Sequence, residues 1–406
     1  MAFDLERVRA DFPSLKQRIN GNRLVYLDSG ASAQKPHQVI NRIADAYTND
    51  YSNVHRGLHT LSNRATEAFE GARERVAEFI GAGDCNQVIF TRSATEAINL
   101  VAHSHAAPRV GRGDEIALSI MEHHSNIVPW HFLRERNGAR LNWFDVGDDG
   151  GFDMGAFERS LNERTRIVAV THMSNVLGTI TPLKEIMEIA HSRGIVVLVD
   201  GSQGAVHCPV DVMDLDVDFY VGTGHKLYGP TGIGFLYGKK ELLEEMRPYQ
   251  GGGEMIFDVS LEGVSYNDPP HRFEAGTPPI VQAIGLARAL DYMDQVGRED
   301  IMEHERELAE YAAQRLSSIN SLRIIGNARD KGAIFSFEIE NIHAHDLCAI
   351  LDRYGVAVRA GTHCAQPLLK RFDATSTCRA SMAMYNGKDD VDALVEAIGK
   401  AMSFFA

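Results

Sequence analysis

Residues 195–200 read Ile-Val-Val-Leu-Val-Asp, a run of five apolar side chains closed by a carboxylate. Such a run is typical of a strand that is buried on both faces, as happens when helices cover both sides of a parallel sheet. Similar strand-like runs recur along the chain and alternate with helical patterns. We predict strands at 87–91, 115–119, 141–146, 167–172, 195–200, 218–222 and 234–237. This alternation predicts an α/β fold with a mostly parallel, seven-stranded sheet flanked by helices.

Two turn-rich stretches, at 250–254 and 267–279, interrupt this pattern before a helical segment that begins near residue 280 and runs past 296. Beyond it we predict a second set of elements, with strands at 333–339 and 356–359 and helices at 345–354 and from 389 onward. A chain of 406 residues is longer than one hydrophobic core usually serves. We therefore predict an N-terminal segment (1–22) packed on the small domain, a large domain (23–290) and a smaller α+β C-terminal domain (291–406).

The charge balance limits the class of partner. The chain has 55 acidic and 41 basic side chains and a net charge of −14, the wrong sign for binding nucleic acid. No run is apolar enough for a signal peptide or a membrane span, so we expect a soluble, cytoplasmic protein. The five cysteines lack paired CxxC spacing, which predicts reduced thiols and no metal site.

Lys226 lies in the most informative segment, Gly-Thr-Gly-His-Lys-Leu-Tyr-Gly-Pro-Thr-Gly-Ile-Gly at 222–234. A lysine that follows a strand end and is flanked by glycines is well placed for desolvation. Desolvation lowers the pKa of the amine and frees it to form an imine with an aldehyde cofactor. A nucleotide-binding loop is disfavoured because Leu227 stands where the GxxxxGK[ST] pattern requires Ser or Thr. An ordinary surface turn is the second alternative.

Asp200 closes the strand at 195–200 and is followed by Gly-Ser-Gln203. Ligands of open α/β sheets bind at the carboxyl ends of the strands. A carboxylate there can pair with the protonated pyridine nitrogen of pyridoxal 5′-phosphate (PLP), and Gln203 can donate to the phenolic oxygen of the same ring. Taken alone, Asp200 is equally well explained as a helix cap. Its place one βα unit before Lys226 favours the cofactor role.

Thr95 lies where a predicted strand gives way to a helix. The hydroxyl of Thr95 and the free amides of the helix N-terminus could hold a phosphate group, together with Thr223 and His225. The alternative is that Ser93 or Thr95 only caps the helix.

A histidine pair, His123 and His124, follows the predicted strand at 115–119 and therefore lies at the same sheet edge. An imidazole there could stack on the cofactor ring and move protons. A metal site is disfavoured because no third ligand accompanies the pair at helical spacing.

Cys364 follows a predicted strand on a glycine-containing loop, beside Arg359 and His363. Two neighbours that can carry positive charge favour the thiolate, which is the form that attacks sulfur. Arg379, farther along the small domain, could bind a substrate carboxylate through two hydrogen bonds. Three other cysteines are expected to be inert core residues, namely Cys85, Cys208 and Cys348.

The order of these motifs resembles that of the class V aminotransferases, a group of fold-type I PLP enzymes, and is most similar to the SUF-type (group II) cysteine desulfurases. The likeness runs nearly from end to end of the chain. It is carried by LDSGAS at 27–32, NVHRGLH at 53–59, EHHSN at 122–126, HMSNVLG at 172–178, DGSQ at 200–203, GHKLYGP at 224–230, FEAGTP at 273–278, RAGTHCAQP at 359–367 and CRAS at 378–381.

The resemblance implies a role for each candidate residue. It implies that Lys226 binds PLP covalently, that Asp200 contacts the pyridine nitrogen and Gln203 the phenolic oxygen, and that His123 stacks on the ring. The other implied contacts are Thr95, Thr223 and His225 at the phosphate, Thr277 at the phosphate of the neighbouring subunit of a homodimer, Asn175 and Arg379 at the substrate carboxylate, and His55 and Arg359 near the substrate.

The resemblance also implies an activity. L-Cysteine is converted to L-alanine, and its sulfur passes to Cys364 as a persulfide and then to a small acceptor protein of the SUF system for iron–sulfur cluster assembly. Thr362 stands where many relatives have a second histidine, and Ala94 where some have another hydroxyl residue. The alternatives are a selenocysteine lyase acting on L-selenocysteine, a class V aminotransferase that needs no thiol, and a non-catalytic scaffold or PLP-sensing regulator.

Overall fold

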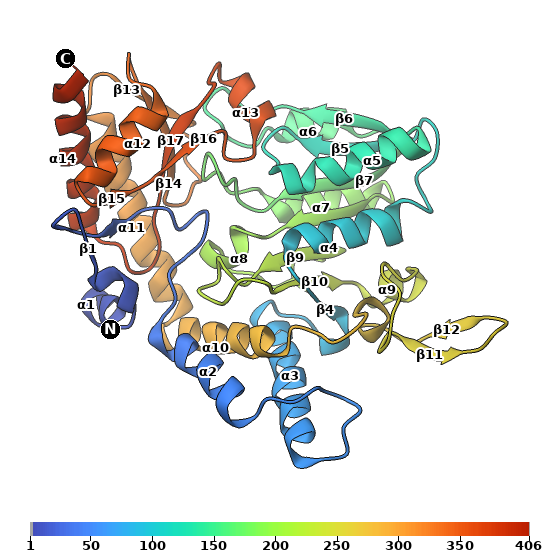
Figure 1. Cartoon of the computed structure of the whole chain (residues 1–406). Helices are drawn as coiled ribbons and strands as arrows, with labels where there is room; N and C mark the ends of the chain where they lie inside the picture. Colours follow the sequence, from blue (N-terminus) through green and yellow to red (C-terminus); the bar gives the residue numbers. More distant parts are fainter. Residues whose placement is uncertain (1–2, 406) are drawn as a thin grey trace.

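The computed structural model describes residues 3–405 (Figure 1). Its largest element is a seven-stranded sheet in the order β4-β10-β9-β8-β7-β5-β6. Its strands are β4 Val88–Thr91, β5 Glu115–Ser119, β6 Arg140–Phe144, β7 Thr165–Thr171, β8 Val196–Asp200, β9 Phe219–Thr223 and β10 Gly234–Gly238. The exception to parallel pairing is β10, which runs antiparallel to β4 and β9. All seven strands predicted for this sheet are present with limits within two residues, so the predicted α/β sheet is confirmed.

Strand β8 explains why this sheet is buried on both faces. Val197 and Val199 belong to one apolar cluster, while Leu198 between them belongs to a second. All three side chains are fully buried. The first cluster includes residues of α2 His37–Asn49, α3 Thr60–Phe79, α7 Leu183–Ser192 and α10 Ile280–Val296. The second includes residues of α4 Ala94–Leu100 and α5 Val128–Asn137, so each face of the strand packs on its own set of helices.

A second, four-stranded sheet lies in the C-terminal part of the chain, in the order β13-β14-β17-β16 (Figure 1). Its strands are β13 Leu322–Ile325, β14 Ile334–Ile339, β16 Arg359–Gly361 and β17 Thr377–Ser381. A third apolar cluster joins this sheet to α11 Arg298–Ser317, α12 Ala344–Arg353 and α14 Lys388–Phe405. The domain limits at residues 22 and 290 stay predictions.

The single strand predicted at 356–359 is wrong, because two strands with different partners occupy this stretch. β15 Val356–Ala357 pairs in parallel with β3 Val25–Tyr26, whereas β16 pairs antiparallel with β17. The change of partner depends on strands that are distant in the sequence, so the local apolar pattern does not indicate it. It matters for the site because β16 leads directly into the Cys364 loop.

A hairpin that the sequence did not predict stands out from the body of the molecule (Figure 1). It consists of β11 Ile256–Val259 and β12 Val264–Tyr266. Its apolar side chains face solvent in this single chain, with Phe257 80% and Leu261 101% exposed. Such an apolar surface is characteristic of a segment that packs on another molecule.

The remaining helices and strands connect these layers. They are α1 Leu5–Ala10, β1 Arg18–Ile19, β2 Asn22–Arg23, α6 Met154–Ser160, α8 Gly204–His207, α9 Lys240–Glu245 and α13 Gln366–Arg371, with short helical turns at Pro13–Lys16, Cys85–Gln87, His124–Asn126 and His271–Phe273 and a π-helical turn at Val101–Ala106. Within residues 3–405, none of the helices has both the length and the apolar character needed to cross a membrane.

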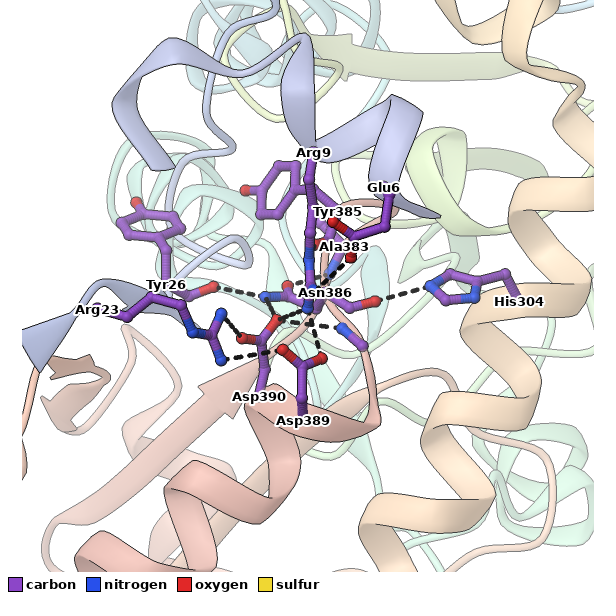
Figure 2. A network of polar contacts seen from close by, with 11 residues as sticks. Glu6, Arg9, Arg23, Tyr26, His304, Ala383, Tyr385, Asn386, Asp389 and Asp390 are labelled. Carbon is purple, nitrogen blue, oxygen red and sulfur yellow. Dashed lines mark hydrogen bonds and ion pairs between the residues drawn. The ribbon is translucent and has the colours of Figure 1, made fainter. Parts of the chain in front are cut away.

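Arg9 of the N-terminal segment and Arg23, just after it, form ion pairs with aspartates at the start of α14 (Figure 2). Arg9 donates to Asp389 at 2.6 Å and to Asp390 at 2.9 Å. Arg23 donates to the second carboxylate oxygen of Asp390 at 2.7 Å. Asp390 is buried, so its charge is balanced by two guanidinium groups rather than by water. The described part of the N-terminal segment thus contacts the C-terminal helix.

Arg73 of α3 is a buried cation that joins the helix to the sheet. It is 1% exposed, and it donates to Glu274 at 2.5 and 2.9 Å, to Glu70 at 2.8 Å and to the carbonyl of Val88 at 2.9 Å. Replacing Arg73 with Met leaves the largely buried Glu274 carboxylate with the backbone N–H of Phe90 but without its cation. We expect Arg73→Met to lower the free energy of unfolding by about 3–5 kcal/mol, measured by urea denaturation.

Arg306 provides the matched control. It also contacts two glutamates, Glu303 and Glu310 at 2.6 Å each, but on an exposed helix surface. Exposed ion pairs contribute little to stability because water solvates both partners. Arg306→Met should therefore leave the denaturation midpoint unchanged. Equal midpoints for the two variants would contradict the role assigned to Arg73.

Candidate active site

A cavity of about 280 Å³ opens at the carboxyl ends of the parallel strands, between the two sheets. In the parallel register, Thr171 of β7 lies beside Asp200 of β8, which brings successive strand ends to one edge. Most of the predicted site residues line this cavity. They are Thr95, His123, Asn175, Asp200, Gln203, Thr223, His225, Lys226, Arg359, Cys364 and Arg379.

Asp200 presents one carboxylate oxygen that no described residue contacts through a hydrogen bond. Its other oxygen, Oδ1, accepts from the backbone N–H of Ser202 at 3.0 Å and from the Ser202 hydroxyl at 2.5 Å. The residue is 4% exposed, yet it lines the cavity. A buried carboxylate that is hydrogen-bonded through one oxygen can accept a hydrogen bond from a protonated ring nitrogen through the other oxygen.

Gln203 has a fixed amide orientation. Its Nε2 donates to the carbonyl of Gly30 at 2.8 Å, and a carbonyl only accepts, so the nitrogen must face Gly30. One amide hydrogen is therefore already used, and one remains for a ligand. The amide oxygen is buried without a partner, which leaves room for a donor group in the cavity.

Lys226 is the only lysine among the described residues that line the cavity. It lies in the turn between β9 and β10, and no described group accepts a hydrogen bond from its Nζ. Burial, with a smaller effect from Arg379, lowers the pKa of Lys226 to about 8, while Asp200 opposes this shift. A substantial fraction of the amine is thus neutral near physiological pH, the form that attacks a carbonyl carbon.

This pKa leads to a prediction for the protein without added cofactor. Reductive methylation with formaldehyde and cyanoborohydride requires the neutral amine. At Lys226 the rate should rise roughly tenfold between pH 7 and pH 9 and then level off, because most of the amine is neutral above pH 8. Peptide mass spectrometry measures the rate at Lys226, and a rate that rises by far more than tenfold over this range and keeps rising above pH 9 would contradict the prediction.

His123 and His124 have separate positions. The Nδ1 of His123 accepts from the backbone N–H of Ser125 at 3.1 Å, and burial next to Lys226 lowers the pKa of His123 to about 4. The ring is therefore neutral at pH 7 and carries its proton on Nε2. His124 does not line the cavity. Its backbone N–H donates to the carbonyl of Cys364 at 2.7 Å, and its Nε2 accepts from Gln366 N–H at 3.3 Å, a role that the sequence did not predict.

The predicted phosphate-binding residues meet at the N-terminus of α4. The hydroxyl of Thr223 is buried without a partner, and that of Thr95 lies 2.7 Å from the Ser125 hydroxyl. Ser93 is the helix cap, because its hydroxyl accepts from the backbone N–H of Glu96 at 3.4 Å. Burial lowers the pKa of His225 to about 4, so this ring is neutral at pH 7.

Cys364 is the exposed member of the five cysteines. Its backbone is left-handed, with φ of 57° after a φ of 50° at His363, a conformation that side-chain-bearing residues rarely adopt. Hydrogen bonds from outside the loop hold it there. The Nδ2 of Asn175 donates to the carbonyl of His363 at 2.8 Å, and His124 holds the next carbonyl. The loop therefore keeps the thiol at the cavity wall.

The expected pair of cations beside Cys364 is wrong. Burial, with a smaller effect from Arg379, lowers the pKa of His363 to about 3, so its ring is neutral at pH 7. Arg359 is charged, but its Nε and Nη2 donate to the two carboxylate oxygens of Asp28, at 3.0 and 2.8 Å, so its charge is balanced there. The local sequence showed both residues but not their partners.

The other cysteines lie away from the cavity. Cys208 is buried, and burial raises the pKa of its thiol to about 12, as expected of an inert core residue. Cys85 and Cys348 are half-buried rather than core residues. The sulfur of Cys348 lies 3.3 Å from that of Cys378, a contact between residues distant in the sequence.

Arg379 is a buried arginine that lines the cavity. It is 2% exposed, donates to the carbonyl of Asn175 at 2.9 Å and lies 3.5 Å from a carboxylate oxygen of Asp28. Its Nε is buried without a partner. Burial lowers its pKa to about 10, so it stays charged at neutral pH. Asp28, from the LDSGAS segment, is the functional residue that sequence analysis missed, since it orients both Arg359 and Arg379.

Two predicted residues do not reach this cavity within one chain. The Nε2 of His55 lies 2.7 Å from a carboxylate oxygen of Glu70, and the ring of His55 packs edge-on against that of His271. Nitrogen and oxygen atoms of these three residues come within 4.8 Å of one another, but Glu70 also binds the Arg73 guanidinium, which already balances its charge. Thr277 lies in a separate hollow beside Arg92 and Gln250. The contact of Thr277 with a neighbouring subunit stays a prediction, and so does the place of His55 near the substrate.

Comparisons with known proteins agree with this geometry. A family model described as "Aminotransferase class-V" matches residues 25–394. The chain is similar to a cysteine desulfurase of Dickeya dadantii, with 51% identity over 397 residues, 98% of this chain and 96% of the relative. It is likewise similar to a cysteine desulfurase of Pectobacterium atrosepticum, with 49% identity over 399 residues and 98% of both chains.

Among solved structures, the fold matches that of the cysteine desulfurase CsdA (S-sulfonic acid) from Escherichia coli. The TM-score is 0.92, with 41% sequence identity and 100% coverage of both chains. The family model spans most of the chain, and the relatives match it nearly end to end. The chain therefore belongs to the class V aminotransferase family.

Proposed function

We propose that this protein is a PLP-dependent cysteine desulfurase. In the net reaction, L-cysteine and the thiol of Cys364 give L-alanine and a Cys364 persulfide. The substrate's bond from Cβ to sulfur is broken, and a sulfur–sulfur bond is formed. The observation that carries this proposal is that an amine with a lowered pKa, Lys226, and an exposed thiol, Cys364, line the same cavity. The relatives named cysteine desulfurase support it.

The residues of the cavity fit PLP by their chemistry. Lys226 supplies the amine for the aldehyde, Asp200 a free carboxylate oxygen for the pyridine nitrogen, and Gln203 an amide hydrogen for the phenolic oxygen. Buried polar atoms without partners are rare in folded proteins and mark places where a ligand completes the hydrogen bonding. The Thr223 hydroxyl and the Gln203 amide oxygen are two such atoms in this cavity.

When bound, PLP supplies an electron-withdrawing ring that stabilises negative charge on the α-carbon of an attached amino acid. The chain's own residues do the rest. Lys226, freed by the substrate, takes the α-proton as a neutral amine. Asp200 would keep the ring nitrogen protonated by accepting a hydrogen bond from its N–H through the free carboxylate oxygen. Arg379 binds the substrate carboxylate through donors that the fold leaves unused. His123 is neutral and offers its Nε2 hydrogen to the site.

Cys364 acts at the other end of the substrate. Its thiolate attacks the sulfur of the bound cysteine, and the electrons of the carbon–sulfur bond stay with Cβ, which takes up a proton to become the methyl group of alanine. With His363 neutral and Arg359 bound to Asp28, the thiolate gains little from its neighbours in the sequence. Arg379, which stays charged at neutral pH, lines the same cavity.

The test is addition of L-cysteine to the purified, PLP-loaded protein. Alanine and protein-bound sulfane sulfur should form in equal amounts in the first turnover. Formation of a keto acid from cysteine without bound sulfur would favour a class V aminotransferase instead. A faster reaction with L-selenocysteine that leaves no selenium or sulfur on Cys364 would favour a selenocysteine lyase.

Further parts of the proposal concern partners. We propose a homodimer in which the exposed apolar hairpin packs on the second subunit and in which His55 and Thr277, which do not line this chain's own cavity, complete that subunit's site. The exposure of Cys364 supports transfer of its sulfur to a small acceptor protein for iron–sulfur cluster assembly in the cytoplasm.

A further inference from the structure

The loop at 32–35 donates hydrogen bonds to the peptide oxygen that precedes Lys226. This oxygen, the carbonyl of His225, accepts from the backbone N–H of Ala33 at 3.1 Å, from the Ser32 hydroxyl at 3.4 Å and from Nζ of Lys35 at 2.8 Å. A carbonyl oxygen has two lone pairs, so these donors fill its capacity. The plane of the peptide that leads into Lys226 is therefore fixed from outside its own turn.

Lys35 is the strongest of the three donors, because a charged donor makes a stronger hydrogen bond than a neutral one. Its Nζ also donates to the carbonyl of Ala33 at 2.6 Å. No carboxylate within residues 3–405 forms an ion pair with it, and burial lowers its pKa to about 8. A half-buried amine without a carboxylate is unfavourable in a fold. Its two carbonyl contacts are the interactions that compensate.

The same loop also forms part of the cavity wall. Gly30 and Ala31 line the cavity, and the carbonyl of Gly30 accepts from Gln203 at 2.8 Å. Lys35 itself does not line it. The loop thus ties the backbone of Lys226 to the wall that holds the predicted contacts of the cofactor ring, and Lys35 acts on the site only through a peptide group.

We infer that Lys35 is a positioning residue for Lys226. It fixes the His225–Lys226 peptide so that the Lys226 side chain enters the cavity in the direction needed to reach an aldehyde carbon. This inference rests on the proposed function, in which Lys226 forms an imine with PLP. Small displacements of a reacting group lower rates strongly, since a shift of about 1 Å can reduce a rate by as much as a hundredfold.

The experiment measures imine formation at Lys226 rather than turnover. Protein freed of cofactor is mixed with PLP, quenched with borohydride at intervals, and the modified lysine is quantified by peptide mass spectrometry. Lys35→Met keeps the chain length but removes the donor, and we expect labelling of Lys226 to become about tenfold slower. Lys35→Arg keeps the charge and the donors and should restore at least half of the lost rate.

Lys331 offers a matched control. It too is half-buried with a pKa lowered to about 8 by burial, and it donates to a carbonyl, that of Gly326, at 3.2 Å, but it does not line the cavity. In Lys331→Met, PLP should label Lys226 at the same rate as in the unsubstituted protein, even if the melting temperature of the variant falls. This comparison separates a specific effect on Lys226 from a general loss of stability. Should Lys35→Met not fold, Lys35→Gln, shorter and uncharged, should show the same slowing.

An unchanged labelling rate in a folded Lys35→Met or Lys35→Gln variant would overturn the inference. Finding the PLP label on Lys35 in the unsubstituted protein would also overturn the inference, because Lys35 would then compete with Lys226 for PLP rather than position it. A different result would speak against the proposed function: no labelling of Lys226 in the unsubstituted protein.

Discussion

Replacing Lys226 with alanine is expected to abolish the conversion of L-cysteine to L-alanine, lowering the rate by about a thousandfold or more. The substitution removes the group that accepts the α-proton, and a positioned acid or base contributes roughly 10²–10⁴ in rate. It also removes the amine that tethers PLP, so borohydride should no longer link the cofactor to the chain. Alanine formation by chromatography and the mass of the reduced protein are the two measurements.

The control for this variant is Lys331→Ala, because Lys331 is another half-buried lysine with a lowered pKa but lies away from the cavity. It should keep the rate of the unsubstituted protein within about twofold, since it removes no group that touches the substrate. Substantial alanine formation by Lys226→Ala would show that another base does this work, and the assignment of Lys226 would have to be abandoned.

The second large effect is expected for Cys364→Ala. Without the attacking thiol, sulfur should no longer be bound by the protein, and alanine formation should fall by roughly 10²–10⁴. Exchange of the substrate α-hydrogen with deuterium from solvent should continue, because Lys226 and Asp200 are untouched. Bound sulfane sulfur by cyanolysis, alanine release and α-deuteration by NMR measure these effects in one reaction mixture.

Cys85→Ala is the matched control, since Cys85 is half-buried and does not line the cavity. It should retain bound sulfur and turnover. If Cys364→Ala loses deuterium exchange as well, the substitution has disturbed the cavity rather than removed a nucleophile. If persulfide still forms elsewhere on the chain at the original rate, Cys364 is not the acceptor.

The parts of the molecule that the sequence predicted are those whose cause is local. The apolar run of β8 predicts a strand buried on both faces, and Val197 and Leu198 indeed belong to different apolar clusters. Asp200 and Lys226 follow strand ends in a parallel sheet, so topology alone brings them to one edge. The helix from residue 280 was predicted equally well, because its pattern is unbroken between Pro279 and Gly297.

The parts that were missed depend on contacts between distant segments. Strand β17, Thr-Cys-Arg-Ala-Ser, is fully buried but carries no alternating apolar pattern. Burial, with a smaller effect from Arg379, keeps the His363 ring neutral, and the guanidinium of Arg359 donates to Asp28. None of these partners lies near its target in the sequence. The hairpin β11–β12 was missed for a different reason, because its apolar side chains, such as those of Phe257 and Leu261, are exposed in the described part of the chain and form no buried face that an apolar pattern would reveal.

The clamp between Arg9 and the aspartates of α14 has a consequence for how the protein is made (Figure 2). Translation proceeds from the N-terminus, so Arg9 leaves the ribosome well before Asp389 and Asp390, which lie 380 and 381 residues farther along the chain. Until α14 has been made, Glu6 is the one of these ion-pair partners that Arg9 already has. The N-terminal segment can therefore form these ion pairs only after α14 has been made. Chains that end before α14 cannot form them.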